Sequence, residues 1–131
     1  MNKIQNQISY GKNVYDKREI AAVIKTLKKS TQMGLSVEKF EKKIAKFFSK
    51  RYGLMVNSGS SALILAFKVM NFKKGSEIIT PSLTFSTTIA PIYQLGLVPH
   101  FIGALENKFV ADIHQIEKCI NKKTVAIMIP N

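Results

Sequence analysis

The chain has 131 residues, of which 46% are hydrophobic and 21% charged, so its composition is that of a globular chain able to enclose a core. No run approaches the roughly 18 consecutive apolar residues of a membrane helix, and the first residues lack the apolar segment of a secretory signal. This excludes a membrane protein and predicts a cytoplasmic one.

The net charge of +12 raises the question of nucleic-acid binding, but the excess lies mostly in the first 51 residues. Of the 20 basic residues only Arg18 and Arg51 are arginines, whereas readers of bases and phosphates usually depend on arginine forks and aromatic stacking platforms. The lysines fit a solvated helix face better, so no nucleic-acid partner is expected.

Cysteine and histidine are too scarce for a disulfide framework or a Cys/His metal site. Cys119 is the one cysteine, and His100 and His114 are the two histidines. Cys119 falls on the apolar stripe of an expected helix, where a packed thiol is favoured over a reactive one.

Two amphipathic helices are expected first. Asp16 and Glu19 form a pattern resembling a capping box, and apolar residues at helical spacing then predict a helix near 17–28. Ser36 is placed to cap the second helix, whose apolar positions run from Val37 to Phe48.

From residue 53 onward, short β-rich runs alternate with helical ones. The expected strands are 54–56, 77–80, 97–102 and 124–129, and the expected helices are 60–72, 85–95 and 112–120. This alternation predicts an α/β fold with a mainly parallel sheet and helices on both faces. Residues 1–131 are expected to form a single incomplete domain, with a helical segment at 1–52 and βα units at 53–131, because an apolar strand at the end has no covering helix after it.

The strongest local signal is Asn57-Ser58-Gly59-Ser60-Ser61-Ala62, between an expected strand and a helix. Ligands of open α/β sheets bind outside the carboxyl ends of strands, and a helix N-terminus offers unpaired N–H groups to a phosphate. Gly59 allows close approach, and Ser60 and Ser61 add hydroxyl donors. The alternative is that these serines simply cap the helix.

A second loop, residues 80–88, follows the next strand and opens on the same edge. Phe85 lies there among hydroxyl residues, where its ring could lie flat against an aromatic ligand. Considered alone, Phe85 fits an ordinary core residue better. Together the two loops favour a phosphorylated heteroaromatic ligand.

Several motifs in order resemble the DegT/StrS family of pyridoxal-phosphate-dependent sugar aminotransferases. The resemblance covers about residues 8–131 and rests on Gly34 with Phe40-Glu41, residues 57–63, residues 75–81, Thr84-Phe85, Gly96 and Pro99-His100-Phe101. Ser76 and Gly103 depart from the family pattern, each standing where an aspartate is usual, at positions without cofactor chemistry.

The resemblance implies the N-terminal part of an aspartate-aminotransferase-type large domain (fold type I), with pyridoxal 5′-phosphate as cofactor. It implies that Gly59, Ser60 and Ser61 hold the cofactor phosphate, that Phe85 stacks on the pyridine ring, and that Gly34 lies near the sugar-nucleotide substrate. The implied partners are a nucleotide-linked keto-sugar, an amino donor and a second copy of the chain, in lipopolysaccharide or surface polysaccharide biosynthesis.

No residue of this segment is nominated as catalytic. In the family the lysine that binds the cofactor covalently lies C-terminal to the matching segment, and a histidine replaces it in the lipopolysaccharide 3-dehydrase branch. Residues 58–61 with 87–92 look closer to that branch, so the alternatives are a sugar 3-dehydrase on the same scaffold or a non-catalytic fragment. We expect the 131 residues alone to be marginally folded and inactive.

Overall fold

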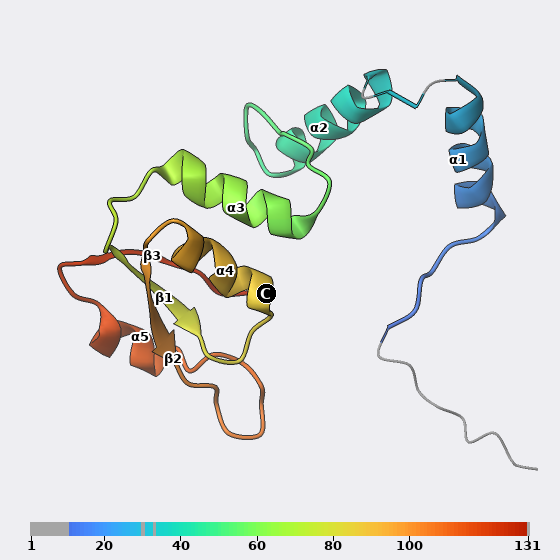
Figure 1. Ribbon diagram of the computed structural model, residues 1–131. Helices are drawn as coiled ribbons and strands as arrows, with labels where there is room; N and C mark the ends of the chain where they lie inside the picture. Colours follow the sequence, from blue (N-terminus) through green and yellow to red (C-terminus); the bar gives the residue numbers. More distant parts are fainter. Residues whose placement is uncertain (1–10, 30, 33, 131) are drawn as a thin grey trace, which may run out of the picture. The chain divides into compact units, whose positions relative to one another are not determined.

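The computed structural model describes residues 11–29, 31, 32 and 34–130. The chain divides into two compact units, residues 1–54 and 55–131 (Figure 1). The first unit is helical, and the second contains the sheet.

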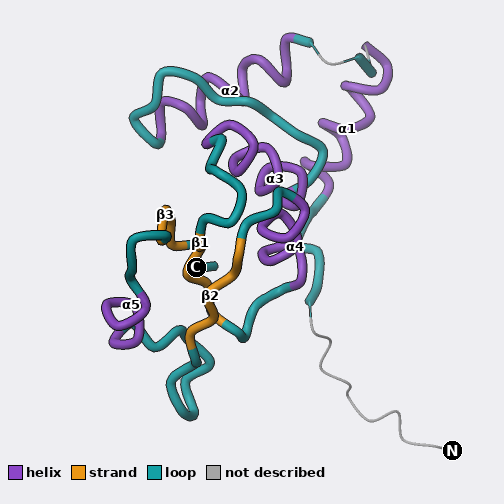
Figure 2. The backbone as a smooth tube through the Cα atoms, turned by 60° about the vertical axis from the view of Figure 1, so that its left-hand side comes forward, coloured by secondary structure: helices purple, strands orange, loops and turns teal. Residues whose placement is uncertain are grey.

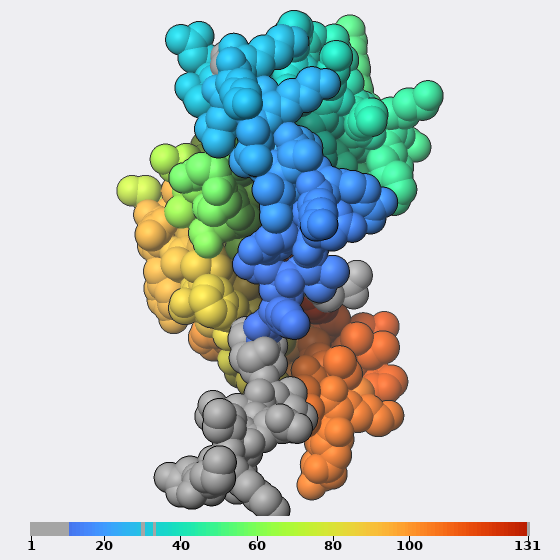
Figure 3. Space-filling view, turned by 90° about the vertical axis from the view of Figure 1, so that its right-hand side faces the viewer, coloured from blue at the N-terminus to red at the C-terminus, as the bar shows by residue number. Residues whose placement is uncertain are grey.

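Helix α1 (Lys17–Lys29) begins as its sequence predicts. The backbone N–H of Asp16 donates to Glu19 Oε2 at 2.7 Å, and the backbone N–H of Arg18 donates to Asp16 Oδ1 at 2.7 Å. None of its residues is buried, and the space-filling view draws this helix in blue (Figure 3). Its apolar stripe is therefore exposed in the described part of the unit.

Helix α2 (Leu35–Phe47) begins one residue before the expected cap. Its N-cap is Gly34, without a side-chain cap, so the prediction that Ser36 caps this helix is wrong. The physical reason is that Leu35 already has helical geometry, which leaves Ser36 inside the first turn. Ala45 is the buried residue of the helix, and a Cβ built at Gly53 would lie 2.7 Å from the carbonyl oxygen of Glu41, so only glycine fits there.

The second unit contains a three-stranded parallel sheet in the order β2-β1-β3 (Figure 2). Ile79 in the middle of the central strand lies opposite His100 on one side and Ile127 on the other. The elements in chain order are α3 (Gly59–Met70), β1 (Glu77–Pro81), α4 (Ser86–Gln94), β2 (Val98–Ile102), α5 (His114–Cys119) and β3 (Thr124–Ile127).

The core lies between the sheet and helices α3 and α4. It is formed by Phe67 of α3, Ile78 of β1, Ile92 of α4 and Leu97, which directly precedes β2. Helix α5 lies on the other side of the sheet, as Figures 1 and 2 show, and Gln115 Oε1 accepts the N–H of Gly103 at 2.8 Å. The expected mainly parallel sheet with helices on both faces is confirmed.

One expected strand is wrong. Residues 54–56 form no strand, and Leu54 is 71% exposed. A β-strand needs the hydrogen-bond ladder of a sheet, and in the described residues β1 pairs with β2 and β3, so the apolar composition of residues 54–56 is not sufficient to make a strand. The other elements appear within a few residues of their expected bounds, although the final strand ends at Ile127 and Cys119 is only half-buried.

No helix of the described residues is long and apolar enough to cross a membrane. In the same part of the chain, no group of three His, Cys, Asp or Glu side chains could hold a metal ion.

Candidate functional site

The two loops singled out in the sequence lie toward the same edge of the sheet. Helices α3 and α4 pack against each other, and in Figure 1 both begin on the side toward which the arrow of β1 points. Their N-termini therefore lie together at the carboxyl end of the central strand. This is where ligands of open parallel sheets bind.

At the start of α3, Ser58 is the N-cap. Its Oγ accepts the N–H of Ser61 at 3.1 Å and lies 3.1 Å from Ser61 Oγ, to which it donates. The first intrahelical bond runs from the N–H of Ala62 to the carbonyl oxygen of Ser58, so the N–H groups of Gly59 and Ser60 precede the helical ladder. Ser58 thus caps the helix, while Ser60 and the Ser61 hydroxyl proton stay available for a ligand.

Gly59 leaves this helix end open. A Cβ built there would meet no atom of the described residues within 4 Å, so no packing contact with that part of the chain explains the glycine. The first turn carries no acidic side chain. Two free N–H groups, two hydroxyls and the positive end of the helix dipole therefore surround a space suited to an anion of phosphate size.

Phe85 is not part of the core. It is 73% exposed and is the N-cap residue of α4, in an extended conformation and without a side-chain cap bond. The alternative that Phe85 is an ordinary core residue is therefore wrong. Its ring is free to cover an aromatic ligand at the same edge.

Two buried hydroxyls near this edge have no partner. Thr80 Oγ1, near the end of β1, and Thr84 Oγ1, in the loop before α4, make no hydrogen bond to any described residue. Thr80 is 0% exposed and closed off in the core, whereas Thr84 is only partly buried, in the loop before Phe85. The donors, the open space at Gly59 and the Thr84 hydroxyl together suit a phosphorylated aromatic group.

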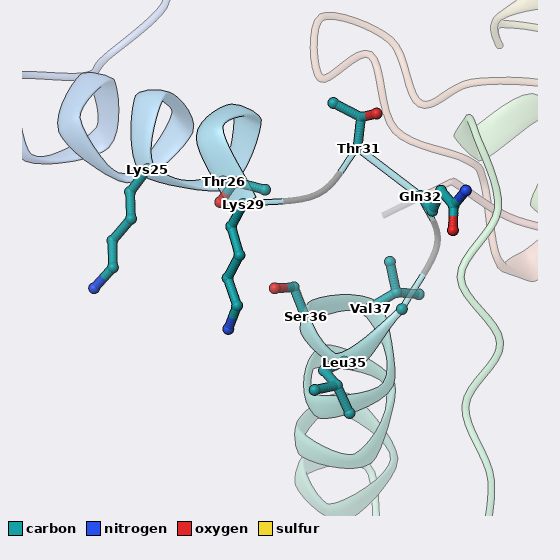
Figure 4. Close-up of a pocket in the computed structure, with 9 residues that line it drawn as sticks. Lys25, Thr26, Lys29, Thr31, Gln32, Leu35, Ser36 and Val37 are labelled. Carbon is teal, nitrogen blue, oxygen red and sulfur yellow. The ribbon is translucent and has the colours of Figure 1, made fainter.

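Gly34 lies in the first unit, where it lines a hollow of about 600 Å³ between the end of α1 and the start of α2 (Figure 4). Lys25 and Lys29 extend from α1 in the same direction, and the Ser36 hydroxyl lies at the start of α2. The hollow is therefore basic on one wall and hydroxyl-bearing on the other.

A polar cluster that the sequence analysis did not find lies on the second unit. Glu77 Oε2 accepts from Asn121 Nδ2 at 2.7 Å and lies 3.4 Å from His100 Nδ1. The hydrogen bond from Asn121, followed by the contact with His100, holds the pKa of Glu77 below its ordinary value. Strand alternation places Glu77 on the face opposite Ile78, away from the core with α3 and α4, so the cluster supports the sheet rather than the candidate site.

The fold and this edge define a class of protein: parallel α/β chains with an open helix N-terminus beside the carboxyl end of a central strand. Residues 13–131 match the DegT/DnrJ/EryC1/StrS aminotransferase family, and the chain belongs to this family.

Individual relatives agree with this assignment. A GDP-4-keto-6-deoxy-D-mannose 3-dehydratase of Yersinia pseudotuberculosis is 31% identical, over 100% of this chain and 35% of its own length. The structure of the Escherichia coli GDP-4-keto-6-deoxy-D-mannose-3-dehydratase with bound hydrated PLP is 33% identical, with a TM-score of 0.80, over 88% of this chain and 32% of that one. The Helicobacter pylori aminotransferase PseC, involved in pseudoaminic acid biosynthesis, is 30% identical, with a TM-score of 0.79, over 91% of this chain and 33% of that one. The chain thus spans about a third of the length of the relatives it matches.

Proposed function

We propose that this chain is the N-terminal part of a pyridoxal-phosphate-dependent aminotransferase that acts on a nucleotide-linked keto-sugar in lipopolysaccharide or surface polysaccharide biosynthesis. The observation that carries the proposal is the open N-terminus of α3 beside an exposed aromatic ring, in a chain of this family. In this proposal both units belong to one larger domain, and the 131 residues alone are inactive.

The chain's own residues would hold the cofactor in two places. The N–H groups of Gly59 and Ser60 and the hydroxyls of Ser60 and Ser61 would bind its phosphate, because the helix end presents donors and a positive dipole. Phe85 would cover one face of its ring and exclude water there. The bound cofactor supplies an electron-withdrawing ring for chemistry at the carbon that carries the amino group.

The substrate would approach the basic hollow at Gly34. Lys25 and Lys29 suit the negative charge of a nucleotide diphosphate, and the volume of about 600 Å³ is in the usual range for a small-molecule site. Gly34→Ala tests this proposal, since its Cβ would lie 3.7 Å from the carbonyl oxygen of Gln32, an ordinary contact that the fold accommodates. We expect weaker binding of the nucleotide sugar with unchanged cofactor binding.

A second candidate function is sugar 3-dehydration on the same scaffold. It is favoured by the names of two relatives, the Yersinia and Escherichia coli 3-dehydratases. The two reactions differ in the cofactor-anchoring position, where the family resemblance implies a lysine for the aminotransferase and a histidine for the dehydrase. Sequencing the gene downstream of codon 131 tests this directly. A lysine in the cofactor-anchoring position supports transamination, and a histidine in the same position supports dehydration.

Cofactor binding is tested on the protein in the longest form its gene encodes. Pyridoxamine 5′-phosphate is the suitable probe, because it lacks the aldehyde that reacts with surface lysines. We expect saturable binding in equilibrium dialysis, lost when Ser60, Ser61 and Phe85 are changed together to alanine. Phe109→Ala, at an exposed ring elsewhere in the second unit, is the matched control and leaves binding unchanged.

Three further expectations stay predictions: a homodimer, an amino donor as second substrate, and a cytoplasmic location. Sedimentation of the same protein tests the first, and amino transfer from candidate donors tests the second.

A further inference from the structure

The second unit holds two threonine hydroxyls that are buried without a hydrogen bond to any described residue. They are Thr80 Oγ1 and Thr84 Oγ1. A hydroxyl taken out of water without a partner is unfavourable, so native proteins seldom retain one without a reason.

The two hydroxyls differ in what a ligand can reach. Thr80 is 0% exposed, and its position in β1 places it on the same face as Ile78, among the core residues. Thr84 is only partly buried and lies in the loop that joins β1 to α4. A rotation about its χ1 moves the hydroxyl to another of the three staggered positions on Cβ without moving the backbone.

The position of Thr84 points to the candidate site. It immediately precedes Phe85, at the carboxyl end of β1 and at the start of α4, a helix whose N-cap has no side-chain bond. The loop therefore presents a hydroxyl without a partner next to an exposed aromatic ring.

We infer that Thr84 is a further cofactor-binding residue, whose hydroxyl donates to an anionic oxygen of the cofactor. The inference rests on the proposed function. Two oxygens have this chemistry, one on the phosphate and one on the ring. Without the cofactor the hydroxyl is buried and unpaired, and with the cofactor it gains a partner.

The inference predicts opposite effects of one substitution on stability and on binding. Thr84→Val keeps the shape and removes the hydroxyl, so the midpoint of thermal unfolding of the cofactor-free protein rises. The same change weakens pyridoxamine 5′-phosphate binding about tenfold, the loss expected for one hydrogen bond to a charged group. Thr84→Ser retains the hydroxyl and binds like the parent.

Thr80→Val is the matched control. It removes the other unpaired hydroxyl at a position that stays sealed in the core, so it raises the unfolding midpoint and leaves binding unchanged. Inorganic phosphate and pyridoxamine, used as separate probes, distinguish the two oxygens: weaker binding of only one of them by Thr84→Val identifies the oxygen that Thr84 contacts.

Thr84→Val that binds pyridoxamine 5′-phosphate like the parent overturns the inference and leaves the proposed function intact. A parent protein that binds no pyridoxamine 5′-phosphate overturns the proposed function and this inference with it.

Discussion

Replacing Gly59 by alanine separates the role of this residue in folding from its role in binding. A Cβ at Gly59 would meet no atom of residues 11–29, 31, 32 and 34–130 within 4 Å, so the substitution has no steric cost in this part of the fold. Glycine is less favourable than alanine inside helices by about 0.5–1 kcal/mol, so Gly59→Ala should change the free energy of unfolding by about 0 to +1 kcal/mol. Because Cα–Cβ bonds tilt toward the helix N-terminus, the new methyl group would enter the space proposed for the cofactor phosphate.

We therefore expect unchanged or slightly higher stability together with at least about tenfold weaker binding of pyridoxamine 5′-phosphate, a loss of about 1.4 kcal/mol or more. Chemical denaturation measures the first quantity and equilibrium dialysis the second. Gly11→Ala is the control, since a Cβ there also meets open space, in the other unit. Parental affinity in Gly59→Ala would refute the proposed close approach of the phosphate.

Substitutions at three further positions test the fold of the second unit. Ser58→Ala removes the cap of α3 and should cost about 1 kcal/mol in urea denaturation, whereas Ser58→Thr retains most of it. Ile92→Ala, at a side chain that is 0% exposed, should cost about 2–5 kcal/mol in the same assay, and Ile92→Val about 0.5–1.5 kcal/mol. Because Asn121 and His100 lower the pKa of Glu77, its stabilisation is fully present above the ordinary carboxyl pKa and is lost as pH falls through the lowered value, so Glu77→Gln should flatten the acid limb of stability against pH.

Each of these three predictions is contradicted by a different result. Equal stability of the alanine and threonine variants of Ser58 would show that the cap bond contributes nothing. A loss below 1 kcal/mol in Ile92→Ala would place this side chain outside the core. An acid limb that is as steep in Glu77→Gln as in the parent would mean that other carboxylates set the pH dependence, and Asn121→Ala should then leave it unchanged as well.

Sequence reasoning succeeded mostly where the determining interactions are local, although it placed the cap of α2 at Ser36 and the structure has it at Gly34. The start of α1 follows from Asp16 and Glu19, three residues apart, and the helices and strands of the second unit follow from their apolar spacing. The open end of α3 was predicted for the same reason, since the cap and the free donors all lie within residues 58–61.

Sequence reasoning failed where the structure depends on a residue that is distant along the chain. Residues 54–56 have the composition of a strand, but pairing depends on a neighbour that composition does not reveal. The cluster of Glu77, His100 and Asn121 joins residues 23 and 44 positions apart, so no local pattern could indicate it. The exposure of Phe85 likewise depends on how α4 is oriented against the sheet.

The central place of β1 has a consequence for the order of folding. Its pairing with β2 closes a loop less than half as long as its pairing with β3. A doubling of loop length costs only about 0.6 kcal/mol of closure entropy, but it favours the nearer pair kinetically. During synthesis β1 and β2 can also associate while the residues of β3 are still being added. The sheet is then completed in two steps, and until the second one the inner strand exposes an edge that other chains could join.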